Sequence, residues 1–297
     1  MCATIDPDVE VVGVTAAAGS ISGVQATRNV QALIELLDPP LRPRIGGCSE
    51  GESAEAMPVD QHAVTPRDMN GLLGLGDYNP PEIDLHNRRE SPKLIVDLVR
   101  DSPNEITLLT LGPLSNVARA FELSPDLPGL LGGLVCLGGS VNYGGNVTAA
   151  AEFNAWCDQI AARAVLRSPA AKTLVPLDVS TRATLTPEQV SQIKPVPSAA
   201  SEMLEAMLQF SLRAHRQHMG IEGVRLDALV AVAVATRPDS FESKSMAIDV
   251  ETSGQLTRGM TVFDRRVMST WQTNIDVVTG IDYLGVADYF LQTIRRI

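Results

Sequence analysis

Aromatic and basic residues are both scarce in this sequence. Aromatic residues make up 4% of its 297 residues, and 24 Lys and Arg face 35 Asp and Glu, so the formal net charge is −11. A field of this sign repels a phosphate backbone, and no local cluster of basic residues offsets it. We therefore expect neither nucleic acid nor an anionic membrane as a partner.

Cysteines are also few, and long apolar runs are absent from the sequence. The four cysteines (Cys2, Cys48, Cys136 and Cys157) stand far apart, with no C-x-x-C pair. This spacing argues against a metal cluster and is typical of thiols in a reducing cytosol. No apolar stretch reaches the length of a membrane span, and the N-terminus has no basic segment followed by an apolar run. The sequence therefore predicts a cytoplasmic protein.

Aliphatic residues are abundant and follow two alternating patterns. Short β-branched runs predict strands at 9–15, 106–111, 133–137 and 173–177, and a hairpin of 246–251 with 259–263. Segments of helical period predict helices at 23–37, 93–100, 114–123, 158–166, 187–193, 199–217, 227–235 and 285–296. We find no repeats and no convincing linker. The alternation therefore predicts one α/β domain over residues 1–297, with a mostly parallel central sheet flanked by helices.

Polar residues follow the strand predicted at 133–137. A Gly-rich loop comes first, and then Asn146, Glu152 and Asn154. Ligands of open parallel sheets bind beyond the carboxyl ends of the strands. Neutral amides with one carboxylate suit sugar hydroxyls, which donate and accept hydrogen bonds. The alternative is that the Asn residues serve turns and the Glu is solvated. A dinucleotide cradle is not supported, because no G-x-G-x-x-G opens a helix after the first strand.

For five other polar residues, helix capping, exposure to solvent or a turn is a more common role than ligand binding. Asp227 begins an apolar helix, where capping is the commonest role of an Asp. His215 and His218 are three residues apart on a helix, but no third metal ligand is within reach by sequence, so we expect them to face solvent. Asp6 and Asp8 precede the first strand, at the wrong end for a ligand, and we expect them in a turn.

Taken together, eight segments resemble the inosine/uridine-preferring nucleoside hydrolase family over nearly the whole chain. In the family's order they are VVGVTAAAGS (11–20), ATRN (26–29), ITLLTLGPLSN (106–116), LGGSVNYGGN (137–146), AAEFNAWCDQIAARAVL (150–166), LDVS (177–180), LDALVAVAVATRP (226–238) and GQLTRGMTVFD (254–264). Several such segments in one order are far more specific than any one alone. The resemblance implies a Rossmann-like nucleoside hydrolase fold. It also implies hydrolysis of the N-glycosidic bond of ribonucleosides, giving ribose and a free base.

The resemblance further implies roles for individual residues. The family's site holds a Ca²⁺ ion that contacts the ribose diol and the attacking water, and an Asp takes the proton of that water. Asn146, Glu152 and Asn154 match the residues that bind the ribose hydroxyls. Asp227 is similar to the C-terminal calcium ligand, and the backbone carbonyl of Leu111 is similar to the family's backbone ligand.

The sequence also departs from the family's pattern. An Asp-rich D-x-D-x-x-x-D-D loop and its strand should precede 9–15, and we expect the first strand, most calcium ligands and the catalytic Asp to be missing. Leu226 stands where the family often has a His near the leaving base, and it cannot donate a proton. Asn70, in the long loop 46–79, matches another His, and Ser20 matches an Asn. Both are candidate substrate-binding residues.

These departures set the expected function. We expect an N-terminally incomplete nucleoside N-ribohydrolase that binds calcium weakly, if at all, and is weak or inactive as written. The loss of a central strand predicts poor solubility or a rearranged sheet. The alternative is a non-catalytic ribose- or nucleoside-binding protein, and a third reading is an active enzyme of altered specificity. A second copy of the chain is the remaining candidate partner. The preferred base is not readable, although base contacts are expected from 46–79 and 199–217.

Overall fold

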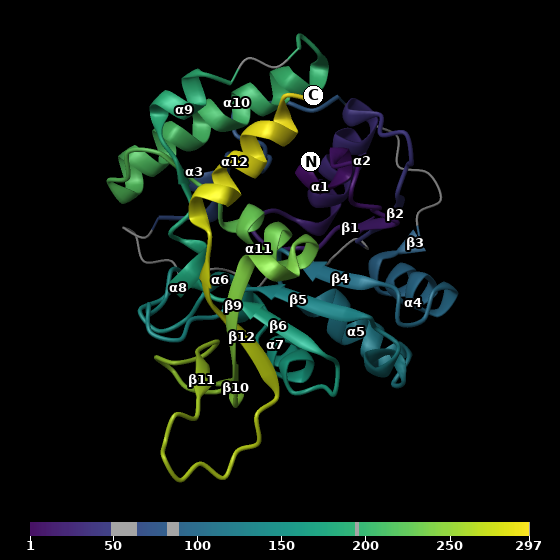
Figure 1. Cartoon of the computed structure of the whole chain (residues 1–297), viewed down its shortest axis with the longest axis vertical. Helices are drawn as coiled ribbons and strands as arrows, with labels where there is room; N and C mark the ends of the chain where they lie inside the picture. The colour runs from purple at the N-terminus through teal and green to yellow at the C-terminus, as the bar shows by residue number, and fades with distance from the viewer. Residues whose placement is uncertain (49–63, 82–88, 194–195, 297) are drawn as a thin grey trace. The chain divides into compact units, whose positions relative to one another are not determined.

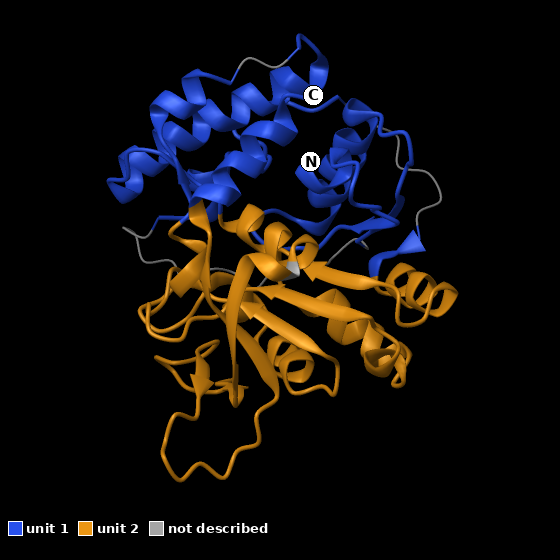
Figure 2. Ribbon diagram, viewed as in Figure 1, with its two compact units in different colours: residues 1–91, 183–226, 284–297 blue, residues 92–182, 227–283 orange. Residues whose placement is uncertain are grey.

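In the computed structural model (Figure 1), the described residues are 1–48, 64–81, 89–193 and 196–296. Their contacts divide the chain into two compact units, which Figure 2 colours separately. Unit 1 comprises residues 1–91, 183–226 and 284–297, and unit 2 comprises residues 92–182 and 227–283. The single domain expected from the sequence stays a prediction.

A five-stranded sheet lies at the centre of unit 2, in the order β4-β5-β6-β12-β9. The strands are β4 (Thr107–Thr110), β5 (Gly133–Leu137), β6 (Lys172–Val175), β9 (Phe241–Met246) and β12 (Ile275–Ile281). The first four in this order run parallel, and β9 pairs antiparallel with β12 at one edge. This confirms the predicted mostly parallel sheet. The predicted hairpin is also present, as β10 (Ile248–Val250) and β11 (Thr261–Phe263).

Helices cover this sheet and bury its aliphatic side chains. They are α4 (Ser91–Asp101), α5 (Ser115–Leu123), η1 (Leu127–Gly129), α6 (Phe153–Cys157), α7 (Gln159–Leu166), α8 (Leu177–Ser180), α11 (Asp227–Thr236) and η3 (Pro238–Ser240). One buried cluster joins α4, α5 and α7 to the sheet and includes Val99, Val165 and Val277. The helix α11 packs on β4, β5 and β6. Each fully buried Val or Leu contributes about 1.5–3 kcal/mol.

Unit 1 contains smaller sheets and several helices. Its strands are β1 (Gly13–Thr15), β2 (Arg44–Gly47) and β3 (Arg89–Glu90), which are parallel, and β7 (Thr184–Leu185) and β8 (Val224–Arg225), which are antiparallel. Its helices are α1 (Cys2–Ile5), α2 (Gly23–Leu37), α3 (Pro66–Asn70), α9 (Pro187–Ser191), α10 (Ala199–Ala214), the π-helix η2 (His215–Met219) and nearly all of α12 (Tyr283–Ile294). Asp6 and Asp8 lie in the expected turn, where Asp6 Oδ1 accepts the Asp8 N–H.

The structure corrects the predicted bounds of several helices and strands. The bounds of α2 and β5 are those predicted, whereas β1 begins only at Gly13. The strand predicted at 173–177 is wrong at its end, because Leu177 already begins α8. The strand β12 was not predicted, although it lies between β6 and β9 and its Val277 is fully buried.

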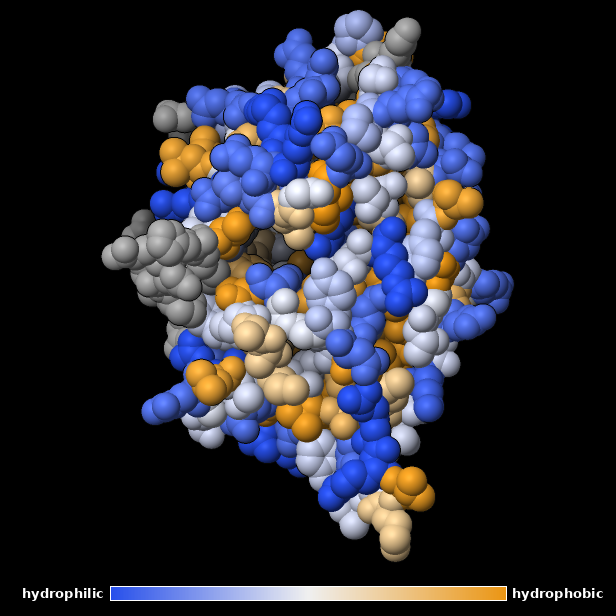
Figure 3. Space-filling view, turned by 90° about the vertical axis from the view of Figure 1, so that its left-hand side faces the viewer, coloured by the Kyte–Doolittle hydropathy of each residue, from blue (hydrophilic) through white to orange (hydrophobic). Residues whose placement is uncertain are grey.

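The surface of unit 2 carries a projecting connection between β11 and β12. Within it, Val267 and Met268 are almost fully exposed, at 104% and 88%. Figure 3 shows hydrophobic side chains at the same end of the molecule. Of the helices that the structure describes, none has both the length and the apolar character needed to cross a bilayer.

Candidate functional site

The carboxyl ends of β4, β5 and β6 lie side by side in unit 2, because the three strands are parallel neighbours (Figure 1). Leu111 follows β4, Gly138 follows β5 and Pro176 follows β6. This is the edge at which open α/β sheets bind their ligands. The side chains predicted to bind ribose are therefore expected at this edge.

Glu152 is buried at the start of α6, with 5% of its surface exposed. Its Oε1 accepts the N–H of Asn154 at 2.9 Å, and its Oε2 accepts those of Ala155 at 3.1 Å and Gly139 at 2.9 Å. The alternative of a solvated Glu is therefore wrong. A carboxylate offers about four acceptor positions, so one position of Glu152 is not used by these three hydrogen bonds.

The electrostatics around Glu152 favour ligands that donate hydrogen bonds. Burial raises the pKa of Glu152 above its ordinary value, the three backbone N–H groups act to lower it, and the nearby carboxylate of Asp227 raises it further. Two carboxylates at one sheet edge repel an anion, whereas they attract a hydroxyl donor or a developing positive charge. A sugar fits this site better than a phosphate does.

Asn154 is buried beside Glu152 and connects two strand ends. Its Nδ2 group donates to the carbonyl of Leu111 at 3.2 Å, after β4, and to the carbonyl of Leu137 at 3.0 Å, at the end of β5. No donor in the described part of the chain occupies its Oδ1 atom, so this atom can accept a ligand hydroxyl. The structure thus brings together two of the predicted residues, Asn154 and Leu111.

Asn146 lies at the surface of the same loop. Its Oδ1 accepts the N–H of Phe153 at 2.8 Å, next to Glu152, and its own N–H donates to the carbonyl of Ala151 at 3.1 Å. The amide oxygen is therefore used to shape the loop, and its Nδ2 group is left to donate to a ligand. A turn role and a ligand role are compatible for this residue.

Asp227 and the Leu111 carbonyl are the two expected calcium ligands in unit 2. Asp227 Oδ1 accepts the hydroxyl of Ser180 at 2.8 Å, and the Leu111 carbonyl accepts from Asn154. Calcium takes six to eight oxygens. Among residues 1–48, 64–81, 89–193 and 196–296, no three His, Cys, Asp or Glu side chains come together as a metal site. The oxygens described here do not by themselves fit a calcium site.

The other predicted residues belong to unit 1. Asn70 ends α3 at the surface, and its carbonyl accepts the N–H of Gly76 at 2.7 Å. Ser20 is half-buried in a bend. Leu226 is buried, with 7% exposed, and its N–H donates to Ala183 at 2.9 Å. An apolar, buried side chain therefore occupies the position at which the family often has a proton donor.

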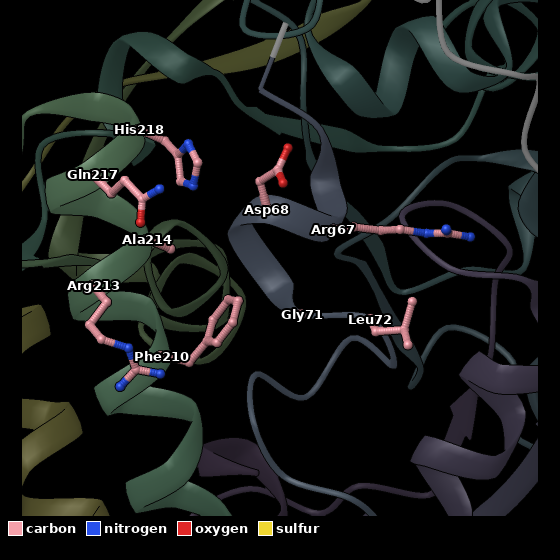
Figure 4. Close-up of a pocket in the computed structure, with 9 residues that line it drawn as sticks. All are labelled: Arg67, Asp68, Gly71, Leu72, Phe210, Arg213, Ala214, Gln217 and His218. Carbon is pink, nitrogen blue, oxygen red and sulfur yellow. The ribbon is translucent and has the colours of Figure 1, made fainter. Parts of the chain in front are cut away.

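A cavity of about 290 Å³ lies in unit 1 between α3 and the end of α10. It is lined by Arg67, Asp68, Gly71, Leu72, Phe210, Arg213, Ala214, Gln217 and His218. Figure 4 shows His218 and Asp68 facing each other and the Phe210 ring reaching in from α10. Apart from His218, the lining residues belong to the two segments, 46–79 and 199–217, from which base contacts are predicted.

Sequence reasoning gave no role to Asp178 or Ser180. Both lie in α8, which follows β6; Ser180 contacts Asp227, and Asp178 contacts the loop after β5. The available signal was the matched segment LDVS, whose polar residues follow a strand of the sheet.

Comparison with known proteins gives one consistent result. A family model described as inosine-uridine preferring nucleoside hydrolase matches residues 1–288. The pyrimidine-specific ribonucleoside hydrolase RihA of Shewanella baltica is 28% identical over 291 residues, 97% of this chain and 89% of that protein. A purine-preferring ribonucleoside hydrolase from Gardnerella vaginalis has a TM-score of 0.87 and 26% identity, covering 99% of this chain and 92% of that chain. An inosine-guanosine nucleoside hydrolase has a TM-score of 0.84 and 26% identity, covering 100% and 94%. The predicted fold is confirmed.

Proposed function

Because this chain belongs to the inosine-uridine preferring nucleoside hydrolase family, we propose that the residues at the carboxyl edge of unit 2 bind the ribose of a ribonucleoside. The reaction of the family is hydrolysis of the N-glycosidic bond to ribose and a free base. One observation carries the assignment of the site. Glu152 and Asn154 are both buried at the edge where ligands bind, and each keeps one acceptor position for a hydroxyl.

The charges of the site suit the chemistry of this reaction. As the glycosidic bond breaks, the ribosyl group passes through an oxocarbenium-like state and gains positive charge. The carboxylates of Glu152 and Asp227 stabilise that charge, because they are held in a fixed arrangement before the reaction begins. The same carboxylates disfavour a phosphorylated ligand, so the proposed substrates are nucleosides rather than nucleotides.

Turnover by the described residues is proposed to be slow. A proton donor to the leaving base typically contributes 10²–10⁴-fold in rate, and Leu226 cannot supply the proton. The family is generally calcium-dependent, and Asp227 and the Leu111 carbonyl, the described oxygens that match its ligands, do not by themselves fit a calcium site. The second candidate function, a ribose- or nucleoside-binding protein without turnover, is favoured by the buried Leu226.

The base, the assembly and the location remain proposals. The relatives named above differ in base preference, one being pyrimidine-specific and one purine-preferring, so neither preference is transferred. A homo-oligomer is proposed as the assembly, and sedimentation velocity distinguishes it from a monomer. A cytoplasmic location and the absence of a nucleic-acid partner stay predictions.

The test compares two asparagines that make the same kind of contact. Asn154 bridges the carbonyls of Leu111 and Leu137, and Asn274, elsewhere in unit 2, bridges those of Leu166 and Ile248. We expect Asn154→Ala and Asn274→Ala to lower stability similarly. Only Asn154→Ala should abolish ribose binding measured by calorimetry, together with base release from uridine and inosine. Equal ribose affinity in the two variants would contradict the proposed site.

A further inference from the structure

The four-residue helix α8 is attached to both halves of the candidate ribose site. It directly follows β6 and begins at Leu177, whose N–H donates to the carbonyl of Gly139 at 3.0 Å. Gly139 also donates its own N–H to Glu152. Gly139 therefore connects the first turn of α8 to the Glu152 carboxylate, which is proposed to bind ribose, through one hydrogen bond to each.

Asp178 holds the loop that follows β5. Its Oδ2 accepts the N–H of Val141 and its Oδ1 accepts the N–H of Asn142, each at 2.8 Å. Ser140 Oγ lies 3.5 Å from the same carboxylate. Hydrogen bonds from backbone N–H groups to a carboxylate are among the stronger ones. Asp178 thus fixes two consecutive peptide groups of the loop that leads to Asn146 and Glu152.

The opposite side of this loop is held by β11. Thr261 Oγ1 accepts the N–H of Ser140 at 2.9 Å and donates to the carbonyl of Ser140 at 2.8 Å. Both residues are buried, with 9% of Ser140 and 5% of Thr261 exposed. Since the loop is clamped between α8 and β11, the contacts of Asp178 have little freedom to rearrange.

Ser180 holds the second half of the site. Its side chain is fully buried, and its hydroxyl donates to Asp227 Oδ1 at 2.8 Å. Asp227 begins α11, while Asp178 contacts the loop after β5. One short helix therefore fixes the position of the Asp227 carboxylate relative to the ribose loop.

We propose that Asp178 and Ser180 are positioning residues of the ribose site, with Asp178 fixing the 138–142 loop and Ser180 fixing the Asp227 carboxylate. This inference rests on the proposed function. Neither side chain needs to touch the substrate. Removing a residue that orients the ligands of a metal site typically changes affinity or activity by 10–100-fold, and an effect of the same order is expected here.

Thr181 provides a matched control. It is the residue after Ser180, and its hydroxyl donates to the carbonyl of Leu177 at 2.8 Å, within the same turn. Thr181→Val removes a hydroxyl from α8 without breaking any bond to the loop or to Asp227. Variants are made in the full chain, and circular dichroism identifies any that do not fold. Asp178→Asn, which keeps one acceptor oxygen, replaces Asp178→Ala if the latter fails to fold.

The experiment combines amide hydrogen exchange, ribose titration and kinetics with uridine. In Asp178→Ala, we expect the Val141 and Asn142 amides to exchange faster and the Kd for ribose to rise about tenfold. In Ser180→Ala, we expect kcat to fall about tenfold with KM unchanged, because the ground-state contacts of the ribose amides remain. Thr181→Val should show neither change.

Two results would overturn the inference, and they have different meanings. If Asp178→Ala and Ser180→Ala match Thr181→Val in ribose affinity and kinetics, the residues are structural only and the proposed function stands. If the unmodified chain neither binds ribose nor releases base from uridine, the proposed function fails, and the inference fails with it.

Discussion

Glu152 Oε2 accepts the backbone N–H of Gly139 at 2.9 Å, and this bond connects the start of α6 to the loop after β5. The same carboxylate accepts the N–H groups of Asn154 and Ala155. Glu152 therefore caps the N-terminus of α6 and also holds the loop after β5 in position. One of its acceptor positions is not used by these three hydrogen bonds. Glu152, which sugar chemistry and the family resemblance predict as a ribose ligand, therefore also fixes the backbone around the candidate site.

The first prediction concerns Gly138, which faces this carboxylate. Gly138 has a φ of +152°, and a Cβ atom there would lie 2.9 Å from Glu152 Oε2. We expect Gly138→Ala to lower the free energy of unfolding by about 1–3 kcal/mol, because of backbone strain and displacement of Glu152, and to weaken ribose binding. Gly129→Ala is the control, since a Cβ there meets nothing within 4 Å. Urea unfolding and calorimetry measure both effects, and equal behaviour of the two variants would exclude this explanation.

The second prediction concerns Leu226. If the missing proton donor limits turnover, Leu226→His should raise kcat on inosine, a substrate whose base leaves more readily when protonated. The expected gain is at least about tenfold, the lower part of the range for general acid catalysis. It should be absent with 4-nitrophenyl riboside, whose leaving group needs no proton. An equal gain on both substrates would point to a change in packing rather than to proton donation.

The third prediction concerns the ion pair of Asp249 in unit 2. Arg163 Nε and Nη2 donate to Asp249 at 2.8 and 3.0 Å, and this hydrogen bonding lowers the pKa of Asp249 below its ordinary value of 3.8. Because the folded pKa is depressed, the stabilisation is present above pH 3.8 and is lost as the pH falls through the folded value. Asp249→Asn should cost about 1 kcal/mol at pH 7, because the Arg163 side chain is 44% exposed and solvent screens the pair.

Urea unfolding at several pH values measures this cost. The difference between Asp249→Asn and the unmodified chain should shrink toward zero below the folded pKa. The exposed pair of Asp126 with Arg100 is the control, and Asp126→Asn should cost less than Asp249→Asn, because solvent screens an exposed pair more strongly. A cost of Asp249→Asn that does not change with pH would show that the ion pair is not its cause.

The fourth prediction concerns Cys136. Burial raises the pKa of its thiol to about 11, from an ordinary value of 9.0. The stabilisation tied to the neutral thiol is therefore present below pH 9.0 and is lost as the pH rises through about 11. At pH 8 we expect iodoacetamide to label the half-buried Cys48 first, with Cys136 labelled only as urea unfolds the chain. Mass spectrometry measures this order, and rapid labelling of folded Cys136 would refute it.

Much of the fold was predictable because its elements have strong local patterns. The helix α2 is long and periodic, and the strand β5 is uniformly apolar, so the sequence predicts the first and last residues of both correctly. The strand β12 was missed because its sequence, IDVVTGI, is bounded by weak turn signals and alternates imperfectly. Its place between β6 and β9 depends on pairing with residues far away in the chain, which no local pattern encodes.

The candidate site was predictable in its residue types but not in its connections. Asn146, Glu152 and Asn154 were identified from chemistry and resemblance, and the structure places them around the start of α6. That Glu152 would hold Gly139, or that Asp178 would hold Val141, could not be predicted. Those contacts join segments from different strand ends, which meet only once the sheet has formed.

The most direct test of the account is the release of base and ribose from uridine by the unmodified chain, measured by chromatography and a reducing-sugar assay. The account predicts slow formation of the two products in equal amounts, lost in Asn154→Ala and retained in Asn274→Ala. No product above the buffer blank, together with no ribose binding, would contradict it.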